Sequence, residues 1–320
     1  MKKKSHIREQ KLTPHIISSS KNSPAIKKMY YFNKNIDFIP VNINRDLLIE
    51  KKNTPVKGLV HKFPGRVLFL LSYSCFANCR FCERQDRVGV GLDNCGMLNE
   101  KEIKSSINYI RKNKTIKEVI FSGGDPLTNP KGLSLAVKLL SKIPHVKILR
   151  IHSKAPIVAP DSINLRLLKE LKSFNGTFYF IVHINHPDEL DKKTVKILSD
   201  IRNLGYIMLN QNIFLKGIND NYMTLKTLFE KLIEIGIKPY YIYHCQDIPP
   251  TKPFVMNIKD EIKIMTKLRE NISGIAFPSH VLDMEGTTGK IIFPTNHWKF
   301  DLTKVKDFTN KYFSLKKWIK

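Results

Sequence analysis

The sequence predicts an α/β fold, a partial (β/α)6 barrel with N- and C-terminal additions. From residue 66 onward, six short runs of β-branched or aromatic residues alternate with stretches of helical spacing. Strands that alternate with helices through short connections form a parallel sheet. Six units are too few for a closed barrel of eight, which favours an open partial barrel over the alternative, a flat doubly wound sheet.

Each expected strand is a short apolar run, and each expected helix follows it with apolar residues on one face. The strands are expected at 66–74, 118–122, 146–152, 177–183, 206–214 and 239–244. The helices are expected at 99–112, 132–142, 162–173, 188–203, 222–235 and 257–270. In the first helix Ile103, Ile107 and Ile110 share a face, and Asn99 with Glu102 resembles a capping box.

The two ends of the chain are expected to lie outside this core. Residues 1 to about 30 are polar and rich in Lys and Ser, which predicts a loose extension. We therefore divide the chain into an N-terminal extension at 1–60, partly disordered at its start, a core at 61–298 and a tail at 299–320.

The amino-acid composition limits the binding partners and the cellular compartment that we expect for this protein. The formal net charge is +26, which would suit polyanions, but the lysines are scattered, so nucleic-acid binding is not expected. No apolar run is long enough to span a membrane, and no apolar stretch follows the basic N-terminus as in a secretory signal. Three of the five cysteines fall within eight residues, which indicates metal binding in a reducing compartment, the cytoplasm.

The three clustered cysteines are Cys75, Cys79 and Cys82, spaced C-x3-C-x2-C on the loop after the first expected strand. Three thiolates on one tight loop suit a [4Fe–4S] cluster, and they leave one iron open to a small molecule. Zinc would need a fourth ligand, and Cys95 or Cys245 could supply it, so a structural zinc site stays open as an alternative.

With this spacing, and with the aromatic Phe81 directly before the last cysteine, the loop resembles that of the radical S-adenosylmethionine (SAM) superfamily. The resemblance implies that SAM chelates the open iron and is cleaved to a 5′-deoxyadenosyl radical. It also implies that Gly123, Gly124 and Asp125, after the second expected strand, receive the amino group of SAM. Two adjacent glycines let the backbone approach a ligand closely.

A longer series of phrases is similar to the lysine 2,3-aminomutase family. The phrases are 61–70, the cysteine loop, 122–126, 149–156, 182–187, 209–211 with 217–220, 239–243 and 283–290, in the family's order. The resemblance implies a pyridoxal 5′-phosphate site in which Lys290 is the Schiff-base and catalytic lysine and Lys62 and Arg66 hold the phosphate. It further implies that His183 and Gln211 lie near SAM.

The same resemblance assigns the substrate contacts. Arg84 matches the arginine that pairs with the substrate carboxylate, and Asp283 matches one of two aspartates around the distal ammonium of lysine. Gln246 stands where the second aspartate is expected, and Asp247 follows it. On a strand a shift by one residue turns a side chain to the opposite face, although a loop could still recruit Asp247.

The leading hypothesis is an isomerase, a radical SAM 2,3-aminomutase that converts L-lysine to β-lysine, with arginine as the next candidate substrate and glutamate the last. An electron donor such as flavodoxin or ferredoxin would be its protein partner. Two alternatives remain open. One is a radical SAM enzyme that modifies RNA without pyridoxal phosphate, and the other is a binding protein with a structural metal.

Overall fold

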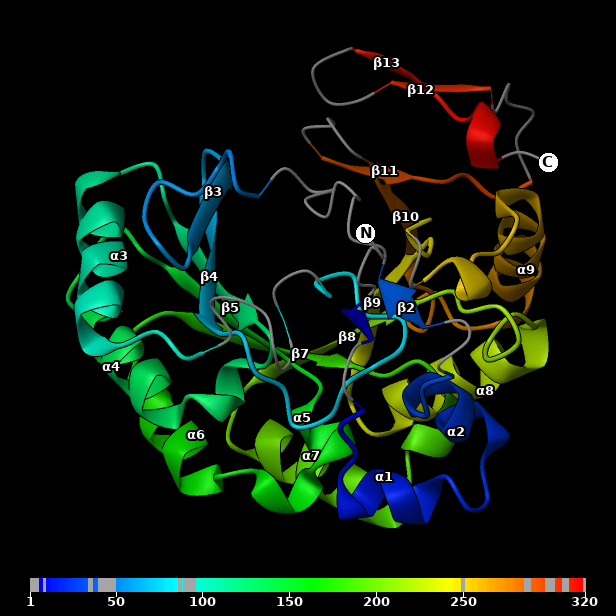
Figure 1. Ribbon diagram of the computed structural model, residues 1–320, viewed down its shortest axis with the longest axis horizontal. Helices are drawn as coiled ribbons and strands as arrows, with labels where there is room; N and C mark the ends of the chain where they lie inside the picture. Colours follow the sequence, from blue (N-terminus) through cyan, green and yellow to red (C-terminus); the bar gives the residue numbers. More distant parts are fainter. Residues whose placement is uncertain are drawn as a thin grey trace, which may run out of the picture.

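A curved sheet of nine strands forms the centre of the molecule, in the order β11-β10-β9-β8-β7-β6-β5-β4-β3. The computed structural model describes residues 6–7, 10–33, 37–39, 50–85, 88, 96–248, 251–284, 289–296, 303–306 and 311–318. Strands β4 to β10 are parallel, and β3 and β11 join the two edges as antiparallel strands. The helices follow one another along the outer side of the sheet (Figure 1).

The six expected strands and six expected helices are all present, so the prediction of an open partial barrel is confirmed. The strands are β3 (Leu59–Phe63), β4 (Arg66–Ser72), β5 (Glu118–Gly123), β6 (Ile148–Ser153), β7 (Thr177–His183), β8 (Ile207–Ile213), β9 (Lys238–Tyr243), β10 (Ser279–Asp283) and β11 (Lys290–Ile292). The helices are α3 (Glu100–Lys112), α4 (Pro130–Leu140), α6 (Leu165–Leu171), α7 (Lys192–Asn203), α8 (Tyr222–Glu234) and α9 (Ile258–Asn271), and a short α5 (Ala155–Val158) follows β6.

Helix α3 shows how a local sequence motif determines where a helix begins. Asn99 Oδ1 accepts from the Glu102 backbone N–H at 3.0 Å, and Glu102 Oε2 accepts from the Asn99 N–H at 2.9 Å. This is a full capping box, which stabilises a helix start by about 1 kcal/mol. Ile103, Ile107 and Ile110 are buried against the sheet, as their spacing predicts.

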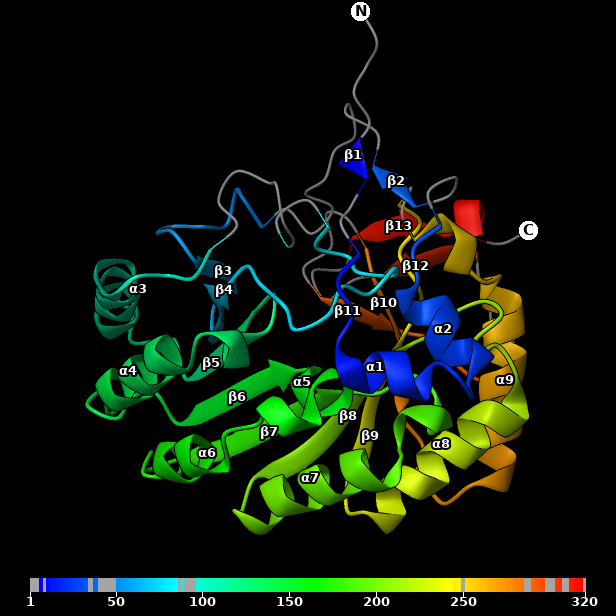
Figure 2. The same ribbon diagram turned by 60° about the horizontal axis from the view of Figure 1, so that its bottom comes forward.

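The expectation of a loose extension is wrong for residues 14–30. They form α1 (Pro14–Ser19) and α2 (Pro24–Tyr30), which lie side by side in Figure 2. Both helices begin with a side-chain cap, Thr13 or Ser23, followed by proline at the first helical position. Their apolar side chains pack with residues of the cysteine loop in a second core. This burial stabilises the two helices although the segment is mostly polar. The disorder expected at the start of the chain, at residues 1–5, falls outside the described residues.

The C-terminal part adds two short strands, β12 (Lys304–Lys306) and β13 (Tyr312–Ser314), paired as an antiparallel ribbon. Leu315 and Trp318 pack beside β10 and β11 in a third core. At the other end β1 (His6–Ile7) pairs with β2 (Phe38–Ile39). The domain limits at 60 and 298 remain predictions.

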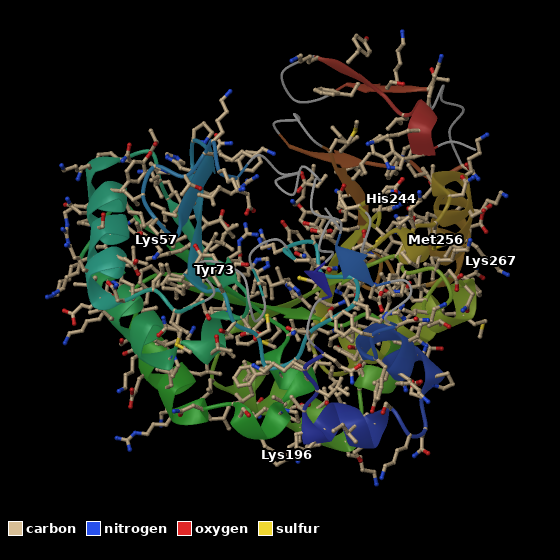
Figure 3. All side chains as sticks on the ribbon, viewed as in Figure 1. Lys57, Tyr73, Lys196, His244, Met256 and Lys267 are labelled. Atoms are coloured by element: carbon tan, nitrogen blue, oxygen red, sulfur yellow. The ribbon has the colours of Figure 1, made fainter. Side chains whose placement is uncertain are left out.

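Lysines are spread over the outside of the molecule. Figure 3 labels Lys196 on α7 and Lys267 on α9 at separate points of the outline, while His244 lies inside. Within the described residues, no helix combines the length and apolarity that a membrane crossing requires.

Candidate active site at the carboxyl ends of the strands

The three clustered cysteines lie on the loop that leaves β4, and all three line one cavity. Within the described residues they form no disulfide, and all three are partly exposed. Cys245, a candidate fourth ligand, lies instead after β9 and is buried in the second core. Cys95 falls outside the described residues. A zinc ion requires ligands that converge on one point, and no three His, Cys, Asp or Glu side chains of the described residues do so. A [4Fe–4S] cluster differs, because each thiolate binds a different iron.

The glycine pair at the end of β5 packs directly against the base of the cysteine loop. The Gly124 N–H donates to Ser72 O at 2.6 Å, and the Asp125 N–H donates to Ser74 O at 2.8 Å. A Cβ at Gly123 would collide with Ser72 O, and one at Gly124 with Ser74 O. Gly123 also has a φ of 117°, which favours glycine. These glycines therefore let the ends of β4 and β5 approach each other.

The Asp125 side chain points away from the glycine turn and joins β5 to β6. Its carboxylate accepts from Ser153 Oγ at 2.9 Å and from the backbone N–H groups of Lys154 and Ala155 at 3.0 Å. Burial raises the pKa of this carboxyl, against the opposing effect of the hydrogen bonds. Because its oxygens are occupied in this way, the segment presents its backbone to the cavity.

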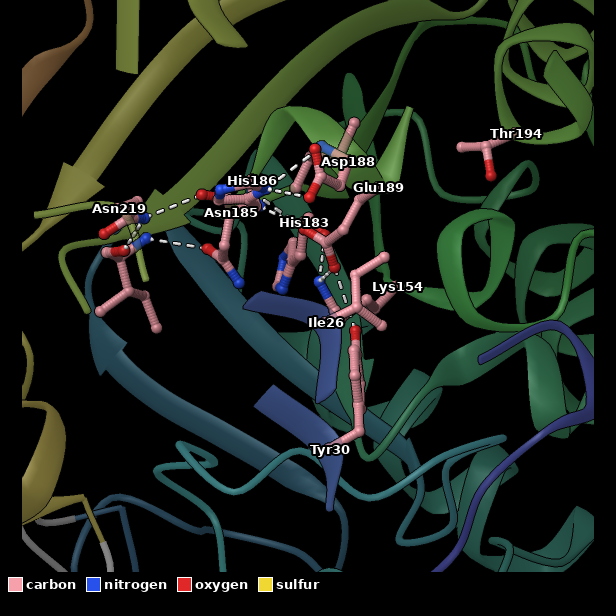
Figure 4. A network of polar contacts seen from close by, with 12 residues as sticks. Ile26, Tyr30, Lys154, His183, Asn185, His186, Asp188, Glu189, Thr194 and Asn219 are labelled. Carbon is pink, nitrogen blue, oxygen red and sulfur yellow. Dashed lines mark hydrogen bonds and ion pairs between the residues drawn. The ribbon is translucent and has the colours of Figure 1, made fainter. Parts of the chain in front are cut away.

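A buried ion pair ties helix α2 to the ends of β6 and β7 (Figure 4). Lys154 Nζ donates to Glu189 Oε1 at 2.7 Å and to His183 O at 2.8 Å. The Tyr30 hydroxyl donates to the same Glu189 oxygen at 3.1 Å and also contacts the thiol of Cys79. An N-terminal residue thus reaches a predicted cluster ligand.

Two histidines stand where the two halves of the cavity meet. The rings of His152 and His183 lie edge to face at 5.7 Å, and both line the cysteine half and the lysine half. Both Nε2 atoms are buried without a hydrogen-bond partner among the described residues. Burial lowers the pKa of both imidazoles, that of His183 to about 3, so both stay neutral and can hydrogen-bond to a ligand.

The second half of the cavity contains Lys290. The antiparallel register of β10 and β11 places Lys290 opposite Asp283, and Lys290 Nζ donates to Asp283 Oδ2 at 2.8 Å. The Tyr243 ring centre lies 5.0 Å from the same nitrogen. Burial would lower the pKa of Lys290, but Tyr243 and Asp283 outweigh that effect and raise it. Burial raises the pKa of Tyr243 to about 12.

The β3–β4 hairpin supplies the cations of this half. Lys62 and Arg66 both line the cavity, and the Arg66 guanidinium lies 4.1 Å from the Phe63 ring centre. Tyr240 and Tyr241 line it as well, with ring centres 3.7 Å apart. Two cations beside an aromatic wall suit a phosphorylated aromatic ligand.

Of the three residues expected to contact substrate, two line the cavity. Arg84 Nη2 donates to Glu50 Oε1 at 2.7 Å, while its buried Nε has no partner among the described residues. Asp283 is the second residue. Gln246 is not part of the cavity wall, because its amide donates to the backbone oxygen of Asp283. Asp247 is exposed.

The structure also adds cavity residues that the sequence did not single out. These are Glu50, Glu83, His152 and Lys154. Sequence position indicated three of them. Glu83 adjoins the last clustered cysteine, His152 ends an expected strand, and Lys154 lies just after that strand. No sequence pattern indicated Glu50, because only the folding of the chain brings it to the site.

Comparison with known proteins agrees with this geometry. The model of the radical SAM superfamily matches residues 69–238. The L-lysine 2,3-aminomutase of Methanococcus maripaludis is 32% identical over 82% of this chain and 61% of its own length. That of Clostridium subterminale is 35% identical over 77% and 58%. The enzyme of Buchnera aphidicola subsp. Baizongia pistaciae is 36% identical over 80% and 74%. The chain thus spans about six tenths of the first two relatives.

Solved structures support the fold. A radical SAM methyltransferase from Sphaerobacter thermophilus gives a TM-score of 0.50 at 14% identity, covering 70% of this chain and 68% of its own. Native anSMEcpe with bound AdoMet also gives 0.50, at 13% identity, covering 63% of this chain and 58% of its own. At these identities the likeness concerns the barrel alone.

Proposed function

The chain belongs to the radical SAM superfamily and, within it, to the lysine 2,3-aminomutase family, and from this premise we propose that it converts L-lysine to β-lysine. The reaction is an isomerisation in which the amino group moves from C2 to C3. One observation carries the proposal. Two adjoining cavities, one at the cysteine loop and one at Lys290, share His152, His183 and Gln211 in their walls.

The residues present suit the three groups that this reaction needs. Cys75, Cys79 and Cys82 would hold the [4Fe–4S] cluster, with Phe81 buried beside them. The backbone of Gly123 to Asp125 and the polar atoms of His183 and Gln211 would hold SAM. Lys62, Arg66 and Lys290 would hold pyridoxal phosphate. When bound, the cluster and SAM supply a carbon-centred radical, and pyridoxal phosphate supplies a π-system through which nitrogen migrates.

The protein's own task is to position and shield the substrate. Arg84 has a free Nε–H to offer a carboxylate beside its pair with Glu50. Asp283 holds Lys290 in place until the lysine reacts, and it then provides an anion for the substrate's distal cation. The neutral His152 and His183 place no charge beside the radical, and each has a buried Nε2 atom without a partner among the described residues that a ligand could engage.

We also propose a cytoplasmic location and a flavodoxin or ferredoxin as electron donor. Clustered cysteines that form no disulfide within the described residues support the first, since such cysteines are typical of a reducing compartment. The cluster chemistry supports the second, since each radical requires one electron from outside the chain.

Anaerobic turnover tests the proposal. Protein reconstituted with iron, sulfide and pyridoxal phosphate should convert L-lysine to β-lysine when SAM and a reductant are present. Borohydride should fix the cofactor on Lys290, as shown by peptide mapping, and Lys290→Ala should remove both signals. Formation of 5′-deoxyadenosine without a β-amino acid, and with no labelled peptide, would favour the RNA-modifying alternative.

A further inference from the structure

The carboxylate of Glu83 has no task in the reaction as described so far. Glu83 follows Cys82 directly and lines both halves of the cavity. Among charged groups, its neighbour Arg84 acts on it most strongly, and Asp283 and Lys290 are also close enough for their charges to act on it. Its neighbour Arg84 turns instead to Glu50, so the two consecutive side chains face different partners.

The position expected to supply a second anion for the substrate does not do so. Gln246 is 8% exposed, and its amide is engaged on the Asp283 backbone oxygen. Asp247 is exposed and lies outside the cavity wall. Neither residue can therefore contact the distal end of a substrate held at Lys290.

Two carboxylates, those of Glu83 and Asp283, share this part of the cavity with the cation of Lys290. Arg84 pairs with Glu50, and Lys290 pairs with Asp283. Glu83 makes no hydrogen bond or ion pair with the residues that the structure describes. Once Lys290 is engaged with a cofactor, Asp283 also lacks its cation. Carboxylates enclosed without a counter-ion are costly, so this part of the cavity requires a cation from the ligand.

We propose that Glu83 is the second carboxylate of the substrate site and, together with Asp283, binds the distal cationic group of the amino acid. The proposal rests on the proposed aminomutase function and adds a specificity-determining residue to it. The two carboxylates come from different parts of the fold, the cysteine loop and the end of β10. A distal ammonium between them is favoured over an uncharged or anionic end group by both charges at once.

The test compares L-lysine with L-norleucine, which has the same chain length without the ammonium. Calorimetric binding to the reconstituted protein, loaded with pyridoxal phosphate but without SAM, should show a preference for lysine. Glu83→Gln should weaken lysine binding about tenfold to a hundredfold, the effect of one charge-assisted hydrogen bond, and leave norleucine binding within twofold. In turnover, the KM for lysine should rise more than kcat falls.

Two further variants control the result. Glu83→Asp keeps the charge and should retain a preference for lysine, whereas Glu234→Gln changes an exposed glutamate of α8 and should alter nothing. Iron content should be equal in all variants, since Glu83 is not a cluster ligand. Unchanged lysine affinity in Glu83→Gln, or equal losses in Glu83→Gln and Glu83→Asp, would overturn the proposal. Wild-type protein that binds lysine preferentially but forms no β-amino acid would refute the aminomutase function alone.

Discussion

A buried cluster of three side chains behind the site yields a quantitative prediction. Glu261 on α9 accepts hydrogen bonds from His244 Nδ1 and His280 Nε2, each at 2.9 Å. All three side chains are at most 3% exposed. His244 follows β9 and His280 lies on β10, so Glu261 fastens together the two strands that lead to the lysine half of the cavity. Replacing Glu261 should therefore destabilise the fold and the site together.

Glu261→Gln keeps the shape of the side chain and removes its charge. A hydrogen bond to a charged group contributes about 1.5–3 kcal/mol, and the amide can still accept one of the two. The variant therefore loses one bond and weakens the other, while one imidazole nitrogen is left facing an amide donor. We expect a loss of about 2–4 kcal/mol in the free energy of unfolding.

Urea unfolding followed by circular dichroism measures this loss, and Glu234→Gln serves as the control. The pH dependence adds a second measurement. Burial tends to raise the pKa of Glu261, but its bonds to His244 and His280 outweigh burial and lower it. The stabilisation is then complete above the unfolded-state pKa of about 4.3 and disappears as pH falls through the lower folded-state value. A loss below about 1 kcal/mol at pH 7, or a loss that grows on acidification, would refute the reasoning.

Four further variants test the cysteine half of the cavity. Cys79→Ala should abolish reductive cleavage of SAM while Cys245→Ala retains it, as followed by 5′-deoxyadenosine formation; loss of iron in both variants would contradict the assigned ligands. Tyr30→Phe should shift the reduction potential of the cluster, measured by an electron paramagnetic resonance titration, because the polar hydroxyl that contacts the sulfur of Cys79 is lost; an unchanged potential would contradict that contact. Gly124→Ala should reduce iron content after reconstitution, because its Cβ would displace the Ser74 carbonyl at the base of the loop; full iron content would show that the loop can yield.

The barrel could be predicted from the sequence because its strands and helices carry strong periodic signals. The expected strand at 177–183 matches β7 (Thr177–His183) in full. The edge strands were missed for a physical reason. β11 has three residues, and its place in the sheet depends on pairing with β10, which no local pattern encodes. The two N-terminal helices do not follow from the polar composition of their segment, and their local signal is the Thr-Pro and Ser-Pro pair at which each begins.

The candidate site could be predicted where a residue's role follows from its position in a motif. The clustered cysteines, Asp283 and Lys290 all line the cavity, and their roles remain predictions. The direction of a side chain could not be inferred in the same way. Asp125 was expected to face SAM, yet its carboxylate accepts hydrogen bonds from the Ser153 hydroxyl and from the backbone N–H groups of Lys154 and Ala155. Gln246 likewise turns to a backbone oxygen that sequence spacing does not reveal.

The geometry of the cysteine loop depends on a segment far away in the sequence. The backbone N–H groups of Asn78 and Arg80 donate to the carbonyl oxygens of Lys11 and Met29, each at 3.0 Å. The Arg80 side chain forms a buried ion pair with Asp37 at 2.8 Å. These partners fix the backbone on both sides of the second clustered cysteine, Cys79, which must present its thiol at a different iron from the other two. A buried pair that loses one partner costs about 3–5 kcal/mol, so the N-terminal segment contributes directly to the position of the loop.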